Sequence, residues 1–245
     1  MGTTTYIDTG NVHLDMELEA TLPYHEVVAS LVIKYSVDSS SDILDIGCGL
    51  GHIENEIKNS NPDLRVDIAD AYDACLATTA SRGNTENKFK IDETKFNILE
   101  VIDKKYDTIV MSHVLEHLIF PAKAIDDVLS MLKQDGVLIL AVPNPVRPFV
   151  FISNLFKYHY VNRGHVYAWD PSHWKNFLEE IMGLEVVEYK TDYIQFPRAT
   201  RSKILRTIGK VIVKLAPWWG YSNIAVVKVS ENTTNSIYNK WKSVS

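Results

Sequence analysis

The chain has 245 residues, 46% of them hydrophobic and 23% charged, which are ordinary values for a globular protein with a full core. Its formal charge of -6 provides no overall attraction to nucleic acid. Cys48 and Cys75 are too few for a disulfide framework, no secretory signal pattern opens the chain, and no apolar run approaches the roughly 20 residues that span a bilayer. We therefore expect a cytoplasmic protein and no nucleic-acid partner.

Strands and helices are predicted to alternate along most of the chain. Residues 1–22 lack a clear hydrophobic period and are expected to form an arm, and a helix is predicted over 24–35. The spacing and breakers then predict strands at 43–46, 64–69, 89–96, 106–111, 137–142, 184–189 and 223–229, and helices near 53–58, 73–81, 122–132 and 171–182. We expect Asp135-Gly136 to close the third of these helices, and the tail 231–245 to be loose.

This alternation favours the α/β class. We expect a doubly wound, mostly parallel, seven-stranded sheet with helices on both faces, whose ligands lie at the carboxyl ends of the strands. No repeat or linker divides the chain, so residues 1–245 are predicted to form one domain.

The sharpest motif is a glycine-rich turn between the first predicted strand and the next helix. Gly47, Gly49 and Gly51 allow the backbone to approach a ligand closely, and Asp45 stands two residues ahead of them. Dinucleotide-binding proteins space these glycines as G-x-G-x-x-G, whereas this chain has G-x-G-x-G. The spacing therefore disfavours a nicotinamide-dependent oxidoreductase.

The turn resembles the first motif of the class I S-adenosylmethionine-dependent methyltransferases, and the resemblance extends from about residue 43 to 189. It is also carried by Leu-Glu-His at 115–117 and by the turn at 132–138. The resemblance implies a Rossmann-like methyltransferase fold and S-adenosylmethionine as the cofactor. It implies that Asp45 helps to hold the ammonium group of the donor and that Asp70, with Asp67 as the fallback, holds the ribose hydroxyls.

The rest of the donor site follows from the same resemblance. An aspartate usually meets the adenine amino group, and this chain has Asn97 in the matching place, where the amide oxygen could accept the same hydrogen bond. The expected cofactor-binding residues are Asp45, Gly47, Cys48, Gly49, Gly51, Asp70, Ala71, Asn97, Ile98 and Ser112.

Candidate catalytic residues follow the fourth predicted strand. His113 and His117 are expected to act with Glu116 as a base for an acceptor hydroxyl, although a packing role stays open for both histidines. We expect no metal. Ubiquinone-biosynthesis O-methyltransferases and small-RNA methyltransferases carry a divalent ion on a similar segment, and the corresponding alternative ligand set here is His113, Glu116, His117 and His165.

Two segments are candidates for contacts outside the donor site. The insert 143–170 is rich in aromatic residues, and we expect His165, Tyr167 and Trp169 to bind the acceptor. Residues 193–230 hold seven lysines and arginines and no acid, and within them the segment 198–216 has an amphipathic helical pattern. That segment either lies on an anionic membrane or packs on the sheet or in a homodimer.

The sequence thus predicts a methyltransferase for a small-molecule or saccharide acceptor, free or lipid-linked, with oxygen as the favoured target atom. The alternative is a cofactor-binding scaffold without activity.

Overall fold

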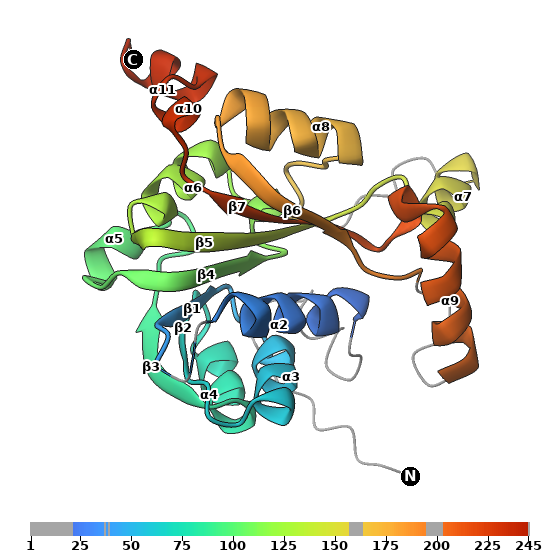
Figure 1. Cartoon of the computed structure of the whole chain (residues 1–245), viewed down its shortest axis with the longest axis horizontal. Helices are drawn as coiled ribbons and strands as arrows, with labels where there is room; N and C mark the ends of the chain where they lie inside the picture. Colours follow the sequence, from blue (N-terminus) through green and yellow to red (C-terminus); the bar gives the residue numbers. More distant parts are fainter. Residues whose placement is uncertain (1–21, 37, 39, 157–163, 195–202, 245) are drawn as a thin grey trace.

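The computed structural model describes residues 22–36, 38, 40–156, 164–194 and 203–244. A seven-stranded sheet with the order β3-β2-β1-β4-β5-β7-β6 runs through the middle of the molecule (Figure 1). Its strands are β1 (Ile43–Ile46), β2 (Val66–Asp70), β3 (Thr85–Lys90), β4 (Tyr106–Ser112), β5 (Leu132–Pro143), β6 (Glu185–Thr191) and β7 (Ser222–Lys228). The first five strands are parallel, and β7 is antiparallel to both β5 and β6. The predicted fold class is confirmed, with a hairpin of β6 and β7 added at one edge.

Helices cover both faces of the sheet (Figure 1). The helices are α2 (Pro23–Tyr35), α3 (His52–Ser60), α4 (Asp73–Arg82), α5 (Ile98–Val101), α6 (Pro121–Leu129), α7 (Pro148–Phe156), α8 (Pro171–Asn176), α9 (Lys203–Leu215), α10 (Glu231–Thr234) and α11 (Ile237–Lys242). A π-helical turn over Phe177–Ile181 extends α8, and short 3-10 turns lie at Leu115–His117 and Pro217–Trp219.

The core consists of two apolar layers, one on each face of the sheet. On one face α2, α3 and α4 pack side chains such as Val28, Ile57 and Leu76 against the strands. On the other face α5, α6 and α8 contribute Ile98, Ile125 and Trp174. The central strands are buried on both faces because a parallel sheet between two helical layers has no solvated side, which explains why most of their residues are apolar.

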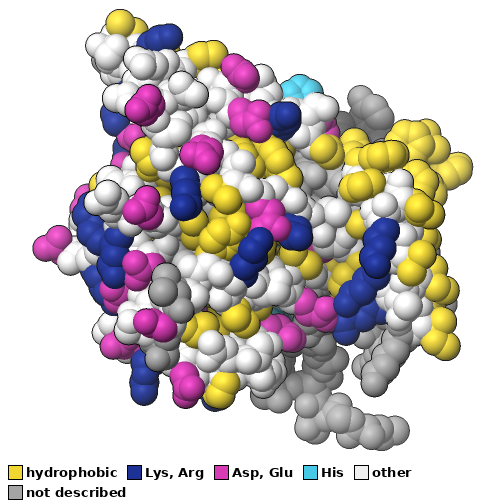
Figure 2. Space-filling view, viewed as in Figure 1, with side chains coloured by type: hydrophobic (Ala, Val, Ile, Leu, Met, Phe, Trp, Pro, Cys, Tyr) yellow, Lys and Arg dark blue, Asp and Glu magenta, His cyan; other side chains and the backbone are white. Residues whose placement is uncertain are grey.

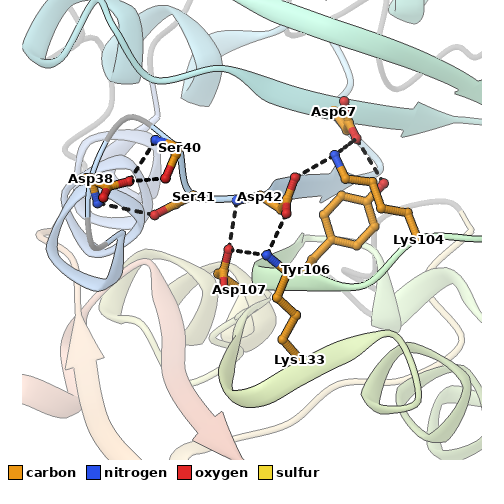
Figure 3. Close-up of polar contacts among 9 residues, drawn as sticks. All are labelled: Asp38, Ser40, Ser41, Asp42, Asp67, Lys104, Tyr106, Asp107 and Lys133. Carbon is orange, nitrogen blue, oxygen red and sulfur yellow. Dashed lines mark hydrogen bonds and ion pairs between the residues drawn. The ribbon is translucent and has the colours of Figure 1, made fainter.

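An ion-pair network ties the strands together at the amino-terminal edge of the sheet (Figure 3). Lys133 forms ion pairs with Asp42 and Asp107, and Lys104 forms ion pairs with Asp42 and Asp67. The Tyr106 hydroxyl donates to Asp67 Oδ2 at 3.0 Å. These residues lie before or at the starts of β1, β2, β4 and β5, so the network holds the edge opposite to the glycine turn.

Three element predictions are wrong in detail. Strand β3 lies at 85–90 rather than 89–96, and α6 ends at Leu129 because β5 already begins at Leu132. Asp135, with φ of 64°, and Gly136 therefore lie inside β5, where the register with β4 shifts.

Most of the tail that the sequence predicts to be loose is helical. Residues 231–234 and 237–242 form α10 and α11, and Tyr238 packs into the core. The predicted arm lies outside the described residues, apart from Leu22. Among the helices that the structure describes, none is long and apolar enough to cross a membrane.

Candidate active site

The glycine turn follows β1 at the carboxyl edge of the sheet and has the backbone conformation that its sequence predicts. Gly47, Gly49 and Gly51 all have positive φ angles, between 53° and 77°. A Cβ on Gly47 would lie 2.3 Å from Val114 Cγ2, and one on Gly51 would lie 2.7 Å from Thr79 Cα. The turn therefore packs directly against the segment that carries the candidate catalytic residues.

Two buried carboxyl groups lie behind the turn. Asp45 and Glu54 are 2% and 1% exposed, and their four oxygens have no hydrogen-bond partner of ordinary geometry in the described structure. Burial raises the pKa of both carboxyls, most strongly that of Glu54. Repulsion from Asp45 adds to the rise at Glu54, and repulsion from Asp70 adds to the rise at Asp45. Because no cation among the described residues pairs with them, the two carboxyls are suited to a cationic ligand group.

Asp70 ends β2 beside the turn. Its carboxylate accepts hydrogen bonds from the backbone N–H groups of Gly49 and Tyr72, each at 2.9 Å. Burial raises the pKa of Asp70, and these backbone donors partly oppose the shift. Asp67, the fallback of the sequence analysis, is engaged by Lys104, Tyr106 and Asn87 in the network at the opposite edge (Figure 3).

The segment after β3 contains two of the expected cofactor-binding residues. Asn97 caps α5 and its Oδ1 already accepts the Asp92 N–H at 2.7 Å. The Ile98 side chain is fully buried in the core, which leaves only its backbone for a ligand. Asp92, which the sequence analysis did not select, follows β3 almost directly, and Thr94 and Lys95 donate hydrogen bonds to its carboxylate.

His113 is held tightly at the end of β4. Its φ is 57°, and its ring stacks on Tyr24 with the centroids 4.0 Å apart. Its Nε2 lies 2.9 Å from Ser222 Oγ and its Nδ1 lies 3.6 Å from Glu116 Oε1. Burial lowers the pKa of His113 well below its usual value, so its imidazole is neutral.

Three other candidate residues meet beside His113. Ligand atoms of Glu116, His117 and His165 lie within 4.8 Å of one another, and the rings of the two histidines are 4.7 Å apart. The Glu116 carbonyl accepts the Val166 N–H at 2.7 Å, which fixes the segment after the insert against the end of β4. Glu116 is buried, whereas His117 is exposed.

The predicted acceptor-binding residues fall into two groups. His165 and Tyr167 lie near the surface, and the Tyr167 hydroxyl donates to the Ile119 carbonyl. Trp169 is 7% exposed and packs against Trp174 and Phe177, so it is a core residue.

The structure adds residues that sequence reasoning missed. The Arg147 guanidinium lies 3.9 Å above the Tyr221 ring, and its Nη1 is buried without a hydrogen-bond partner among the described residues. Asp192 accepts the N–H groups of Tyr221 and Ser222, and burial raises its pKa to about 7. These residues come from three distant segments, and no local motif marks them.

The model of a family described as a methyltransferase domain matches residues 22–189, which is well over half of the chain. The chain belongs to the class I S-adenosylmethionine-dependent methyltransferases. The cofactor of the family is S-adenosylmethionine, and several solved structures of the same fold hold it or S-adenosylhomocysteine.

Relatives and solved structures agree with this methyltransferase assignment. The ubiquinone biosynthesis O-methyltransferase of Rickettsia canadensis is 24% identical over 68% of this chain and 67% of its own length. The malonyl-[acyl-carrier protein] O-methyltransferase of Bacillus anthracis is 26% identical over 48% of this chain, and the match spans 43% of that relative. A putative methyltransferase from Haloferax volcanii, solved with its Trm112 activator, has a TM-score of 0.60 at 15% identity, covering 91% of this chain and 95% of the other.

The residues of this methyltransferase fit the donor. The unpartnered carboxyls of Asp45 and Glu54 suit a cationic amino acid group, and the space at Gly47 and Gly51 admits no Cβ. The carboxylate of Asp70 lies at the end of β2, which is the neighbour of β1, and therefore at the same edge of the sheet.

Proposed function

We propose that this methyltransferase transfers a methyl group to a hydroxyl of a small-molecule or saccharide acceptor, free or lipid-linked. The observation that supports the proposal is the close approach of Gly47 to Val114, because the glycine turn then lies next to the segment of His113, Glu116 and His117. When bound, the donor supplies a methyl group on a sulfonium that is open to attack from the opposite side.

In the proposed donor site Asp45, with Glu54 beside it, holds the ammonium group, and Asp70 holds the ribose hydroxyls. A carboxylate accepts two hydrogen bonds at once, which suits neighbouring hydroxyls. The backbone at Gly47, Cys48, Gly49, Gly51, Ala71 and Ile98, with Asn97 and Ser112, forms the remainder of the proposed donor site.

In the proposed acceptor site His117 takes the proton of the acceptor hydroxyl. His117 is exposed, whereas both ring nitrogens of His113 face protein groups, Ser222 and Glu116. We therefore assign His113 and Glu116 to positioning this segment, and His165 and Tyr167 to contact with the acceptor. To remove a proton from a hydroxyl, the base must be unprotonated at the working pH.

The donor assignment is tested by calorimetric titration with S-adenosylhomocysteine beside the nicotinamide dinucleotides. We expect the thioether alone to bind, and Asp70→Asn to weaken it at least about tenfold through the lost charge-assisted bonds. Asp67→Asn is the matched control, because it removes the same charge at the opposite edge. Binding of a dinucleotide, or equal donor affinity in both variants, would contradict the assignment.

The base assignment is tested by release of S-adenosylhomocysteine in a panel of sugar and phenol acceptors. We expect His117→Ala to lower turnover by a factor on the order of 100 without weakening donor binding. His113→Ala should instead change both turnover and stability. If the wild type binds the donor and turns over no acceptor that carries a hydroxyl, the scaffold alternative replaces this proposal.

A divalent ion is a second candidate for this site. The donor atoms of Glu116, His117 and His165 all lie within 4.8 Å of one another, which does not exceed the largest separation of two ligands about 2.0 to 2.4 Å from one ion. A bound ion would lower the pKa of the acceptor hydroxyl. Calorimetric titration of Mn²⁺ into the wild type and His165→Ala tests it, and equal heats from both would exclude this set.

A further inference from the structure

One end of the molecule carries two helices whose apolar side chains face outward. Both α7 and α9 lie at the right-hand end of the long axis, and hydrophobic side chains gather over this end in the space-filling view (Figures 1 and 2). The C-terminal helices α10 and α11 lie at the opposite end (Figure 1). We call the exposed apolar side chains of α7, α9 and the turn Pro217–Trp219 the apolar end.

Helix α9 presents its apolar stripe to solvent rather than to the core. Ile204, Ile208, Val211 and Leu215 follow one another at helical spacing and are between 42% and 81% exposed. The opposite face packs inward, since a Cβ on Gly209 would meet the Ile194 carbonyl at 2.3 Å and Val213 is buried. An amphipathic helix of a globular protein normally buries such a stripe, so this stripe is suited to a partner.

The neighbouring segments extend the apolar surface. Phe151, Leu155 and Phe156 of α7 are at least 59% exposed. Trp218 and Trp219, in the turn that follows α9, are 55% and 40% exposed. Tryptophan and phenylalanine are the side chains that favour the boundary between lipid headgroups and acyl chains.

The charge of these segments is strongly one-sided. Residues 143–169 and 193–230 together hold ten lysines and arginines and no acid, whereas the rest of the chain holds 15 bases and 31 acids. Within α9, Arg206 and Lys210 pair with Glu26 of α2, and Lys214 is exposed. The segments that form the apolar end are thus basic in sequence, whereas the rest of the chain is acidic.

We propose that the apolar end docks on the surface of an anionic lipid bilayer, with α9 and α7 lying in the headgroup region. Apolar side chains beside bases match a surface that offers acyl chains beneath negative headgroups. A second copy of this chain is a poorer match, because a symmetric contact would bring together two copies of segments that hold bases and no acid.

Docking at this end would direct the carboxyl edge of the sheet toward the bilayer. Helix α7 begins five residues after β5 ends at Pro143, and Trp219 comes three residues before β7 begins. Both segments therefore start at the edge that carries the proposed active site. Access to a lipid-linked acceptor would follow, and that part alone rests on the proposed function.

The test uses the full chain without donor or acceptor, so its result is independent of methyl transfer. We expect the wild type to sediment with vesicles of phosphatidylcholine and phosphatidylglycerol, with a blue shift of tryptophan fluorescence, and to bind pure phosphatidylcholine less. The double variant Ile204→Asp/Leu215→Asp should bind the anionic vesicles at least about tenfold more weakly. Ile237→Asp on α11, an exposed isoleucine at the opposite end, should bind like the wild type.

Circular dichroism and titration with S-adenosylhomocysteine show whether each variant is folded, and Trp218→Ala provides a second, milder variant on the same surface. The proposal is overturned if the wild type does not bind the anionic vesicles, or if Ile237→Asp weakens binding as much as the double variant. It is also overturned if light scattering shows a dimer that the double variant dissociates, since the apolar end is then a protein interface.

Discussion

The carboxylates of this protein differ in what faces them. Asp42, Asp67 and Asp107 are paired with lysines at the amino-terminal edge of the sheet. Asp45 and Glu54 are buried near the carboxyl edge with no cation within ion-pair distance among the described residues. Unpaired buried carboxyls lower stability, so their presence at one edge only is consistent with a ligand that supplies the missing charge.

Asp192 predicts a pH dependence of stability. Burial raises its pKa to about 7, so its protonated form stabilises the fold below pH 4 and this contribution is lost as the pH rises through 7. Asp192→Asn, which keeps an oxygen for the Tyr221 and Ser222 N–H groups, should remove that dependence. Urea unfolding should show the free energies of the two proteins diverging by on the order of 2 to 4 kcal/mol between about pH 4 and 8. Parallel curves would contradict the prediction.

Gly47 predicts a steric effect at the donor turn. In Gly47→Ala the new methyl group meets Val114 at 2.3 Å on a backbone with φ of 77°. We expect a loss of on the order of 1 to 3 kcal/mol in the free energy of unfolding and a weaker affinity for S-adenosylhomocysteine. Adding Val114→Ala should recover part of the stability, because it removes the contact but not the strain. Equal losses in the single and double variants would show that strain alone acts.

At the scale of the elements, the C-terminal helices are docked on the body of the protein. Ser230 and Thr233 donate their hydroxyls to the Gly183 carbonyl, and Tyr238 of α11 is 8% exposed. The sequence of this tail is mostly polar, and the single buried Tyr238 gives no periodic apolar pattern. For this reason the sequence predicts a loose tail.

Tyr238 should therefore contribute to stability. We expect Tyr238→Ala to lower the free energy of unfolding by about 2 to 3 kcal/mol, because a buried aromatic ring leaves a cavity. Trp241→Ala, on the exposed side of the same helix, should change it by less than about 0.5 kcal/mol. Denaturant titration measures both, and similar values for the two variants would argue that the helix is not docked.

The success of prediction from the sequence varies between elements for physical reasons. Buried strands such as β1 and β4 hold short runs of large apolar residues, so their position can be predicted from the sequence. Strand β3 lies at the sheet edge and is mostly exposed, and its sequence TENKFK is mostly polar. The apolar residues that follow it therefore move the predicted strand toward the C-terminus, to 89–96.

The same distinction applies to the candidate site. The glycine turn, Asp70 and the histidines are marked by local motifs, and the structure brings them to one edge. The contacts of Arg147 with Tyr221, and of His113 with Tyr24 and Ser222, join segments far apart in the chain. Such contacts depend on the strand order, which no local pattern contains.

At the scale of the whole molecule, the two edges of the sheet differ. Ion pairs stabilise the amino-terminal edge, whereas the carboxyl edge carries the unpaired carboxyls of Asp45 and Glu54. A ligand at the carboxyl edge should therefore stabilise the entire fold. At a concentration of S-adenosylhomocysteine of 100 times its dissociation constant, we expect about 2.7 kcal/mol of added stability. Thermal unfolding should show the rise, and Asp70→Asn should show a smaller one at the same concentration. An unchanged midpoint for the wild type would argue against binding to the native state.

The β6–β7 hairpin has a consequence for how this protein can be altered. Thr191 pairs with Asn223, so the segment that carries α9 leaves the sheet and returns to it at neighbouring positions. The pairing of β6 with β7 therefore does not depend on the segment between them, as the pairing in a hairpin does not depend on its loop. We therefore expect the rest of the sheet to stay in register when the segment is shortened to a tight turn or replaced by the corresponding segment of another methyltransferase.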